Sequence, residues 1–298
     1  MNREPLHSKS KSALSRRDFL RLIKILGMEA VLLGVGGGIY MREYEPSWVD
    51  VNQVSLKLPR LGKSFSGLRM VQISDLHVGG WMTIERLGDI VQMIIDQFPD
   101  LVVITGDFVI GHNRNPQAME TLGEMAIVLK PLSERFPTFA VLGNHDIWLS
   151  RNSVLKMLRL AGIDTLNNVT HTFVRGSDKL HIVGVDDVME HKARLDLVQP
   201  RLSDDGCAIL LAHEPDFADV SAATGRFDLQ LSGHSHGGQV VLPLIGPPIL
   251  PYLAHKYPSG LYRVLDMYQY TNRGVGMTSP YVRFNCRPEI TVFTLESA

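Results

Sequence analysis

The feature of this chain that most constrains its fold is a series of short apolar runs, each followed directly by glycine or a polar residue. Buried strands have this form. The runs span residues 68–74, 101–105, 138–143, 180–185, 207–212 and 227–232. Between them, residues 83–98 and 115–129 repeat apolar positions with helical spacing. This order of strands and helices predicts a layered α/β domain.

The last third of the chain also contains strand-like segments. VVLP (240–243), LYRVLD (261–266) and ITVFTLE (290–296) are predicted as strands. The Pro-rich stretch PLIGPPILPY (243–252) cannot continue a central strand and is predicted to be a loop. The apolar residues between Leu242 and Leu253 either cover the core or meet lipid, and we favour core cover.

The polar residues that follow the apolar runs are nearly all of types that bind metals. In an open α/β sheet, ligands bind beyond the carboxyl ends of the strands. A lone Asp there is usually a turn former and a lone His a hydrogen-bonded core residue, but five such strand ends together predict a common site. Its residues are Asp75 and His77, Asp107, Asn144, His145 and Asp146, His213, and His234 and His236.

The residue types in this group suit hydrolysis of a phosphate ester. Two divalent cations about 3.5–4 Å apart would neutralise the anion and supply a metal-bound hydroxide as nucleophile. One carboxylate must bridge the cations, and Asp107 is the natural candidate. Neutral imidazoles and one amide would complete the two ligand shells, which leaves His145 as an acid. The remaining ligands are predicted to be His77, Asn144, His213, His234 and His236.

The order of these motifs resembles that of the calcineurin-like metallophosphoesterase superfamily. The matching segments are Asp75-Leu76-His77, Gly106-Asp107, Gly143-Asn144-His145-Asp146, His213 and Gly233-His234-Ser235-His236. The resemblance extends from about Gly67 to the C-terminus. Residues Gly237–Gln239, Lys256, Tyr257, Gly260, Arg283 and Pro288–Ile290 are similar to a bacterial branch of predicted phosphohydrolases, of which some are exported by the twin-arginine route.

The resemblance implies a sandwich of two mixed β-sheets flanked by α-helices, formed by residues 67–298. It implies that Asp75, His77, Asp107 and His236 hold one metal, and that Asp107, Asn144, His213 and His234 hold the other. His145 would protonate the leaving oxygen or stabilise the charge developing there. Asp146 would orient the ring of His145.

The N-terminal 44 residues are predicted to be a signal or a membrane anchor. Seven Lys and Arg residues precede residue 25, against only Glu4 and Asp18, and the segment Ser15–Arg21 resembles a twin-arginine signature. An amphipathic surface helix is the alternative. Residues 30–40 look like a signal h-region and no cleavage pattern follows, so the leader could stay attached as an anchor. Residues 45–66 are predicted as a linker and first strand.

These features favour a two-metal phosphodiesterase, rather than a monoesterase, in the bacterial cell envelope, periplasmic or anchored in the inner membrane. The expected partners are the twin-arginine export machinery, the membrane and a phosphate ester that could be lipid-linked. One alternative is an enzyme similar to UDP-2,3-diacylglucosamine pyrophosphatase of lipid A synthesis, on the cytoplasmic face. The other is a metal-binding scaffold without catalysis, which the filled ligand set disfavours.

Composition and residue types restrict the possible partners, metals and disulfides. A net charge of −1 and a pI near 6.8 argue against a nucleic-acid-binding protein. Oxygen and imidazole ligands without thiolate suit manganese, iron or zinc. Cys207 is expected to be a buried apolar residue, and a disulfide with Cys286 stays open. Residues 112–114 lie either against substrate or in a solvated loop, and His255 and Lys256 are weaker candidates for phosphate contact.

Overall fold

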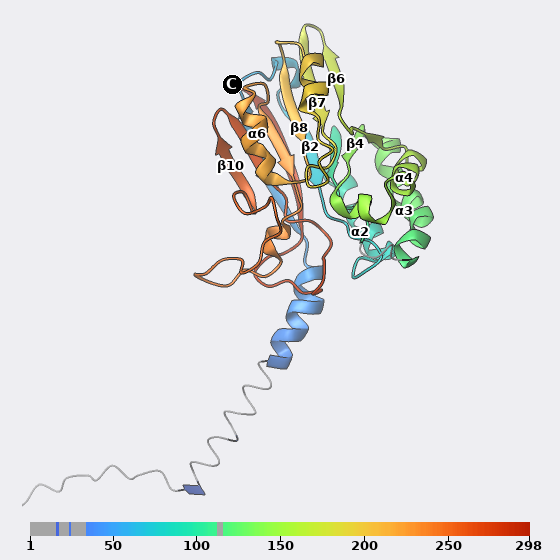
Figure 1. Cartoon of the computed structure of the whole chain (residues 1–298), viewed down its shortest axis with the longest axis vertical. Coiled ribbons are helices and arrows are strands. Elements are labelled where there is room, and N and C mark those ends of the chain that lie inside the picture. The colour runs from blue at the N-terminus through green and yellow to red at the C-terminus, as the bar shows by residue number, and fades with distance from the viewer. Residues whose placement is uncertain (1–15, 18–23, 25–33, 112–115) are drawn as a thin grey trace, which may run out of the picture.

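Two six-stranded sheets pack against each other in a computed structural model that describes residues 16–17, 24, 34–111 and 116–298 (Figure 1). The first sheet has the strand order β1 (Asp50–Leu58), β12 (Glu289–Ser297), β2 (Leu68–Ile73), β3 (Leu101–Thr105), β4 (Thr138–Val141) and β5 (Asp164–Thr165). The second has the order β10 (Gly260–Val264), β11 (Met267–Thr271), β9 (Leu229–Ser232), β8 (Cys207–Leu211), β7 (Asp178–Gly184) and β6 (Val169–Arg175).

Both sheets are mixed. In the first, β2 to β5 run parallel to one another, and β12 lies antiparallel to β2 and parallel to β1. In the second, β7, β8, β9 and β11 are parallel, while β6 and β10 pair antiparallel at the two edges. The predicted sandwich of two mixed sheets flanked by helices is therefore confirmed.

The central strands of the first sheet are buried on both faces. In β3, Val102 and Ile104 point to the helical side, whereas Leu101 and Val103 point to the second sheet. Successive side chains of a strand alternate between faces, so a strand covered on both sides must be apolar at every position. This is why β3 reads as the unbroken run LVVIT.

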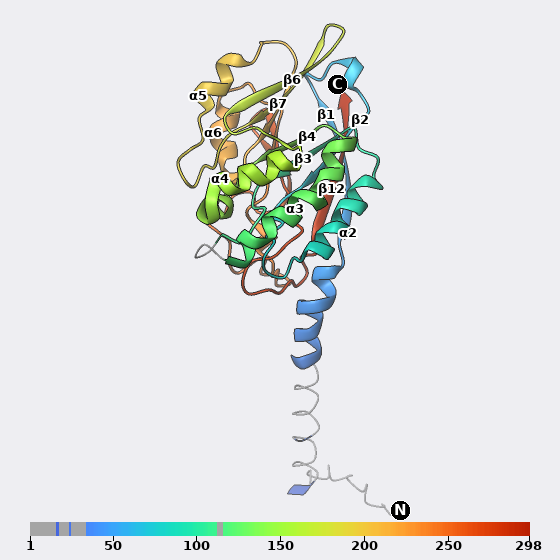
Figure 2. The same cartoon turned by 90° about the vertical axis from the view of Figure 1, so that its right-hand side faces the viewer.

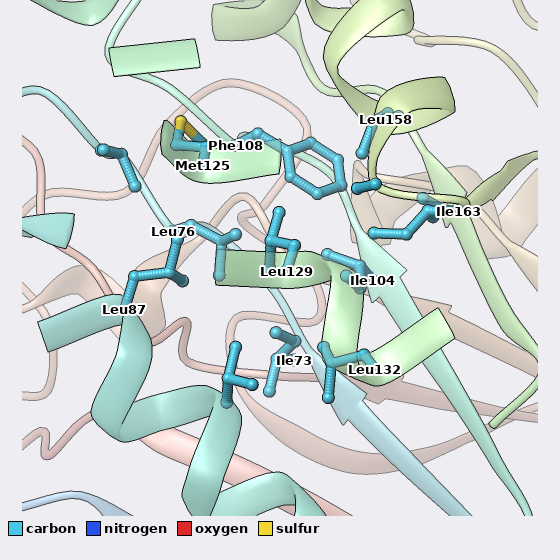
Figure 3. Close-up of a cluster of buried hydrophobic side chains, with 14 of the residues drawn as sticks. Ile73, Leu76, Leu87, Ile104, Phe108, Met125, Leu129, Leu132, Leu158 and Ile163 are labelled. Atoms are coloured by element: carbon cyan, nitrogen blue, oxygen red, sulfur yellow. The ribbon is translucent and has the colours of Figure 1, made fainter. Parts of the chain in front are cut away.

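Helices cover the outer face of each sheet. The first sheet is covered by α2 (Ile84–Ile95), α3 (Pro116–Arg135) and α4 (Asn144–Leu160), as Figure 2 shows. Leucine, isoleucine and phenylalanine side chains interlock between these helices and the sheet (Figure 3). The shorter α5 (Leu195–Val198) and α6 (Ala218–Ala223) cover the second sheet. Between the sheets lies a second apolar layer that includes Cys207, and both Cys207 and Cys286 are buried free thiols.

One expected strand does not form. Segment 240–243 makes only single bridges, from Val240 to Phe284 and from Leu242 to Gly246, so its assignment as a strand was wrong. Pro243 and the proline pair at 247–248 lack the N–H groups that a strand ladder needs. The segment is instead part of the long loop that connects β9 to β10.

The described part of the leader is a helix that projects from the folded body (Figures 1 and 2). Residues 34–39 are helical, Tyr40–Tyr44 continue as a wider turn, and Glu45–Ser47 form a short 3-10 turn before β1. The base is fixed to the body, because Arg283 N–H donates to the Met41 carbonyl at 2.8 Å and Cys286 N–H to Glu45 Oε1 at 2.6 Å. Most of the twin-arginine-like segment lies outside the described residues. Among the residues that are described, no helix combines the length and apolarity needed to span a bilayer.

Candidate metal centre

The strand-end residues of both sheets meet at one edge of the sandwich. Residues from the first sheet follow β2, β3 and β4, and those from the second follow β8 and β9. All of them are buried: Asp75, His77, Asp107, Asn144, His145, Asp146, His213, His234 and His236. The structure therefore brings the nine predicted site residues into one region, although they span 162 positions of the sequence between Asp75 and His236.

Asp75, His77 and His236 form the first group, with ligand atoms within 4.8 Å of one another. The Nε2 atoms of the two rings are 3.0 Å apart, and His236 Nε2 is 3.4 Å from Asp75 Oδ1. Burial lowers the pKa of His77 to about 3 and holds that of His236 well below its ordinary value. Both rings are therefore neutral at pH 7, which is the form that binds metals.

Asp107, His213 and His234 form the second group. His213 donates from Nδ1 to the Thr105 carbonyl at 2.6 Å, and His234 donates from Nε2 to the Tyr252 carbonyl at 2.8 Å. Each backbone carbonyl thus fixes the proton of a neutral ring on the nitrogen that donates to it. The other ring nitrogen is then unprotonated and can bind a metal. Such an outer hydrogen bond is typical of metal-binding histidines.

The donor atoms of the second group fit a cation. His213 Nε2 and Asn144 Oδ1 are buried without a hydrogen-bond partner among the described residues. Burial disfavours a charged ring at His213, yet the Asp107 carboxylate 3.2 Å away outweighs this effect and raises the pKa of His213 well above its ordinary value. The geometry therefore calls for a positive charge between Asp107 Oδ2 and His213 Nε2, and a divalent cation would supply it.

Asp107 lies between the two groups. Its Oδ2 atom is 3.6 Å from His77 Nε2 and 3.2 Å from His213 Nε2. Burial raises the pKa of the Asp75 carboxyl to about 7, and the nearby Asp107 carboxylate adds to the effect. Two cations that share Asp107 would compensate both carboxylates.

Backbone strain accompanies this convergence. Five site residues have φ between 48° and 67°, in the left-handed region that residues other than glycine rarely adopt. They are Asp75, His77, Asp107, His234 and His236. Such conformations persist where the surrounding structure holds them, and they gather at functional sites. Neighbouring glycines make room, since a Cβ at Gly143 would clash with the Asp107 carboxylate.

His145 and Asp146 are both hydrogen-bonded to backbone N–H groups. His145 Nδ1 accepts a hydrogen bond from Gly111 N–H at 3.1 Å, so a neutral ring carries its proton on Nε2. The Asp146 carboxylate accepts from the backbone N–H groups of residues 107, 108, 109 and 143 at 2.8–3.3 Å. These backbone bonds tie the Asp107 loop to the start of α4, and the role of Asp146 in orienting the His145 ring stays a prediction.

The sequence also offered weaker candidates for contact with substrate, at residues 112–114 and 255–256. Lys256 is not directed at the site, because its ammonium pairs with Asp219 and its N–H with Asp216. His112, Asn113 and Arg114 lie outside the described residues. Sequence reasoning did not identify the carbonyls of Thr105 and Tyr252 that orient the ligand rings, and backbone acceptors leave no signal in residue identity.

A cleft of about 510 Å³ opens over both groups. Its polar floor is formed by Asp107, Asn144, His145, His234 and His236. Its walls are mostly apolar, and are formed by Trp148, Met189, Val240, Pro248, Ile249, Pro251 and the loop at residues 278–280. Of the described residues that line the cleft, none is Lys or Arg.

Comparisons with known proteins agree with this geometry. Residues 68–238 match the family model of calcineurin-like phosphoesterases. The chain is 36% identical to the metallophosphoesterase YkuE of Bacillus subtilis over 95% of this chain and 98% of that protein. It is 31% identical to the phosphodiesterase YaeI of Escherichia coli over 95% and 99%, respectively. A transmembrane protein with a metallophosphoesterase domain from Danio rerio is 33% identical over 98% of this chain and 67% of that protein. The chain thus belongs to the calcineurin-like phosphoesterase family and is a metal-dependent phosphoric ester hydrolase.

Proposed function

We propose that this enzyme hydrolyses phosphodiesters with two divalent cations and acts at the bacterial cell envelope. The observation that carries the proposal is the pair of buried ligand groups that share Asp107. A single cation would need only one group. Two groups joined by a carboxylate match the two-metal arrangement used for in-line displacement at phosphorus.

The ligands divide between two positions. One cation would be held by Asp75, His77 and His236, and the other by Asn144, His213 and His234, with Asp107 common to both. Bound there, the cations would supply Lewis acidity towards the phosphoryl oxygens and a nucleophile at neutral pH. Manganese, iron and zinc all suit oxygen and imidazole donors.

His145 is proposed to assist departure of the leaving oxygen. The Gly111 N–H bond places the proton of a neutral ring on Nε2, and the ring borders the cleft. An imidazole in this state can donate a hydrogen bond from Nε2 to the leaving oxygen and so stabilise the negative charge that develops there. Asp146 acts indirectly, because its carboxylate holds the Asp107 loop in position.

The lining of the cleft supports a diester over a monoester. A phosphate monoester carries close to two negative charges at neutral pH and is commonly held by Arg or Lys, whereas a diester carries one. The described lining has neither side chain, and its apolar walls can accommodate a second ester substituent. The 31% identity to a phosphodiesterase points the same way.

The preference is tested by comparing kcat/KM for bis(p-nitrophenyl) phosphate and p-nitrophenyl phosphate on manganese-loaded enzyme. We expect the diester to be preferred, and a preference for the monoester would contradict the assignment. The envelope location rests on the twin-arginine-like leader. It is tested by fractionation and protease accessibility of tagged protein in intact cells, where protection of the catalytic domain would contradict it.

A further inference from the structure

The loop between β9 and β10 presents an apolar surface to solvent. Its segment 240–254 contains no Asp, Glu, Lys or Arg. Leu244 is fully exposed, and Ile245 and Ile249 are 75% and 79% exposed. The expectation that this stretch covers the core is therefore wrong for these side chains. A cluster of exposed aliphatic residues of this kind marks an interaction site.

The tip of the loop is held in place by its own backbone. Leu242 and Gly246 exchange hydrogen bonds of 3.0 and 2.8 Å, which closes a tight turn around Leu244 and Ile245. Val241 N–H donates to the Phe284 carbonyl at 2.8 Å, and Asp216 N–H to the Leu253 carbonyl at 2.9 Å. The two exposed side chains are thus displayed on a turn that is tied to the body at both ends.

The loop separates the catalytic cleft from the base of the N-terminal helix. On one side, Pro248, Ile249 and Pro251 form a wall of the cleft above the metal ligands. On the other side, Pro243 lines a second cavity, of about 520 Å³, together with Tyr40 and Trp48. Figure 1 shows the orange loop protruding at the same end of the body as the blue helix.

The helix continues the apolar surface outward from the body. Its exposed large side chains include Val35, Ile39, Tyr40 and Tyr44, and Trp48 follows at its base. Tyr252 adds an exposed aromatic ring on the loop. Tyr and Trp beside aliphatic residues are characteristic of the membrane–water interface, because one end of each ring system is apolar and the other is polar.

We propose that the segment 240–253 and the helix at residues 34–44 form one membrane-docking surface, which seats the mouth of the catalytic cleft on a lipid bilayer. The charges along the chain favour a bilayer over a protein partner. The docking loop is uncharged, while residues 1–24 carry seven basic against two acidic residues and complement anionic headgroups. An apolar contact and a basic stretch in the same chain are the two kinds of signal that stable membrane attachment requires.

The proposed surface also defines a class of substrate, an inference that rests on the phosphodiesterase function proposed above. With Leu244 and Ile245 in the interface, the wall formed by Ile249 connects the acyl region to the ligands at the cleft floor. An amphiphile whose phosphodiester headgroup lies at the bilayer surface could enter without leaving the membrane. We therefore assign the substrate to membrane-embedded lipids with a phosphodiester headgroup.

Insertion of the loop can be tested separately from attachment by the leader. Cys207 and Cys286 are buried, so Leu244→Cys introduces one accessible thiol for an environment-sensitive nitrobenzoxadiazole label. Leu265→Cys is the matched control, an exposed leucine with positive φ at the β10–β11 turn. With phosphatidylethanolamine–phosphatidylglycerol vesicles, the label at 244 should shift to shorter wavelength and the label at 265 should not. Equal responses at the two positions, or a shift at 244 on concentrating the protein without vesicles, would overturn the proposal, the latter in favour of self-association.

The consequence for catalysis is tested with the double substitution Leu244→Glu/Ile245→Glu in the full chain. Vesicle partition should fall about 100-fold, as expected when two large aliphatic side chains no longer bury in lipid. Hydrolysis of bis(p-nitrophenyl) phosphate should be unchanged, while hydrolysis of a phosphodiester lipid in the same vesicles should fall. Ile127→Glu/Leu265→Glu is the control. Unchanged partition would refute the docking surface; activity of the parent protein on neither diester would refute the proposed function instead.

Discussion

Replacement of Arg283 by Met tests how the first ligand group is supported. Arg283 is fully buried, and its guanidinium donates to the carbonyls of Arg273, Gly274, Gly276 and Cys286 at 2.7–3.1 Å. Three of these carbonyls belong to residues 273–276, which lie against Asp75, because Gly276 N–H donates to the Asp75 carbonyl at 2.8 Å. Methionine fills much of the volume but donates no hydrogen bond.

The magnitude follows from the hydrogen bonds lost. A hydrogen bond from a charged donor contributes about 1.5–3 kcal/mol to stability. The cost of burying the guanidinium, which is several kcal/mol, offsets part of the total from its hydrogen bonds. Burial lowers the pKa of Arg283, which reflects that opposing cost. We expect a net loss of about 3–5 kcal/mol in the free energy of unfolding, because four buried carbonyls lose a charged donor while the cost of burying the guanidinium is removed as well.

The assay is urea unfolding of the metal-free protein, followed by metal titration of the folded variant. The midpoint should fall by about 1 M or more, and metal affinity by about 10- to 100-fold, as for loss of an outer-shell support. Arg263→Met is the control, since Arg263 is exposed and stacks on Tyr268 at 4.6 Å, a contact contributing about 0.5–1 kcal/mol. A loss below about 1 kcal/mol for Arg283→Met, equal to that of the control, would refute the reasoning.

Four further predictions follow from the site and the leader. His145→Ala should retain metal but lower turnover by about two to four decades, and unchanged turnover would exclude a role for His145 in departure of the leaving oxygen. Asn144→Ala should reduce metal content measured by mass spectrometry, and unchanged content would exclude Asn144 as a ligand. Manganese should restore diester hydrolysis to chelated wild-type enzyme, and full activity after verified metal removal would contradict the dependence on metal. Despite burial, Arg273 and Tyr270 lower the pKa of Glu289, so its stabilising effect is present above pH about 4.5 and lost as the pH falls through the folded-state pKa. Glu289→Gln should therefore flatten the stability profile below that pH, and an unchanged acid limb would contradict this. Arg16→Lys/Arg17→Lys should retain the protein inside the cell with its activity intact, whereas unaltered export would exclude a twin-arginine address.

The sequence by itself predicted the α/β class, because strands buried on both faces must be apolar along their whole length. Six such runs became β2, β3, β4, β7, β8 and β9. The same logic failed at β6, whose side chains are mostly not buried and whose alternation is weak. It also failed at residues 240–243, where composition suggested a strand and the following prolines prevented one.

Residue types and their order were also enough to select the candidate ligands. Residues of metal-binding type follow five of the predicted buried strands, and turn formers or core histidines alone would not produce that pattern. The tautomers of His213 and His234 and the backbone hydrogen bonds of Asp146 came only from the tertiary structure. These features depend on backbone carbonyls, N–H groups and left-handed φ angles contributed by segments distant in sequence. Such groups are common to every residue, so side-chain identity cannot reveal which of them will meet.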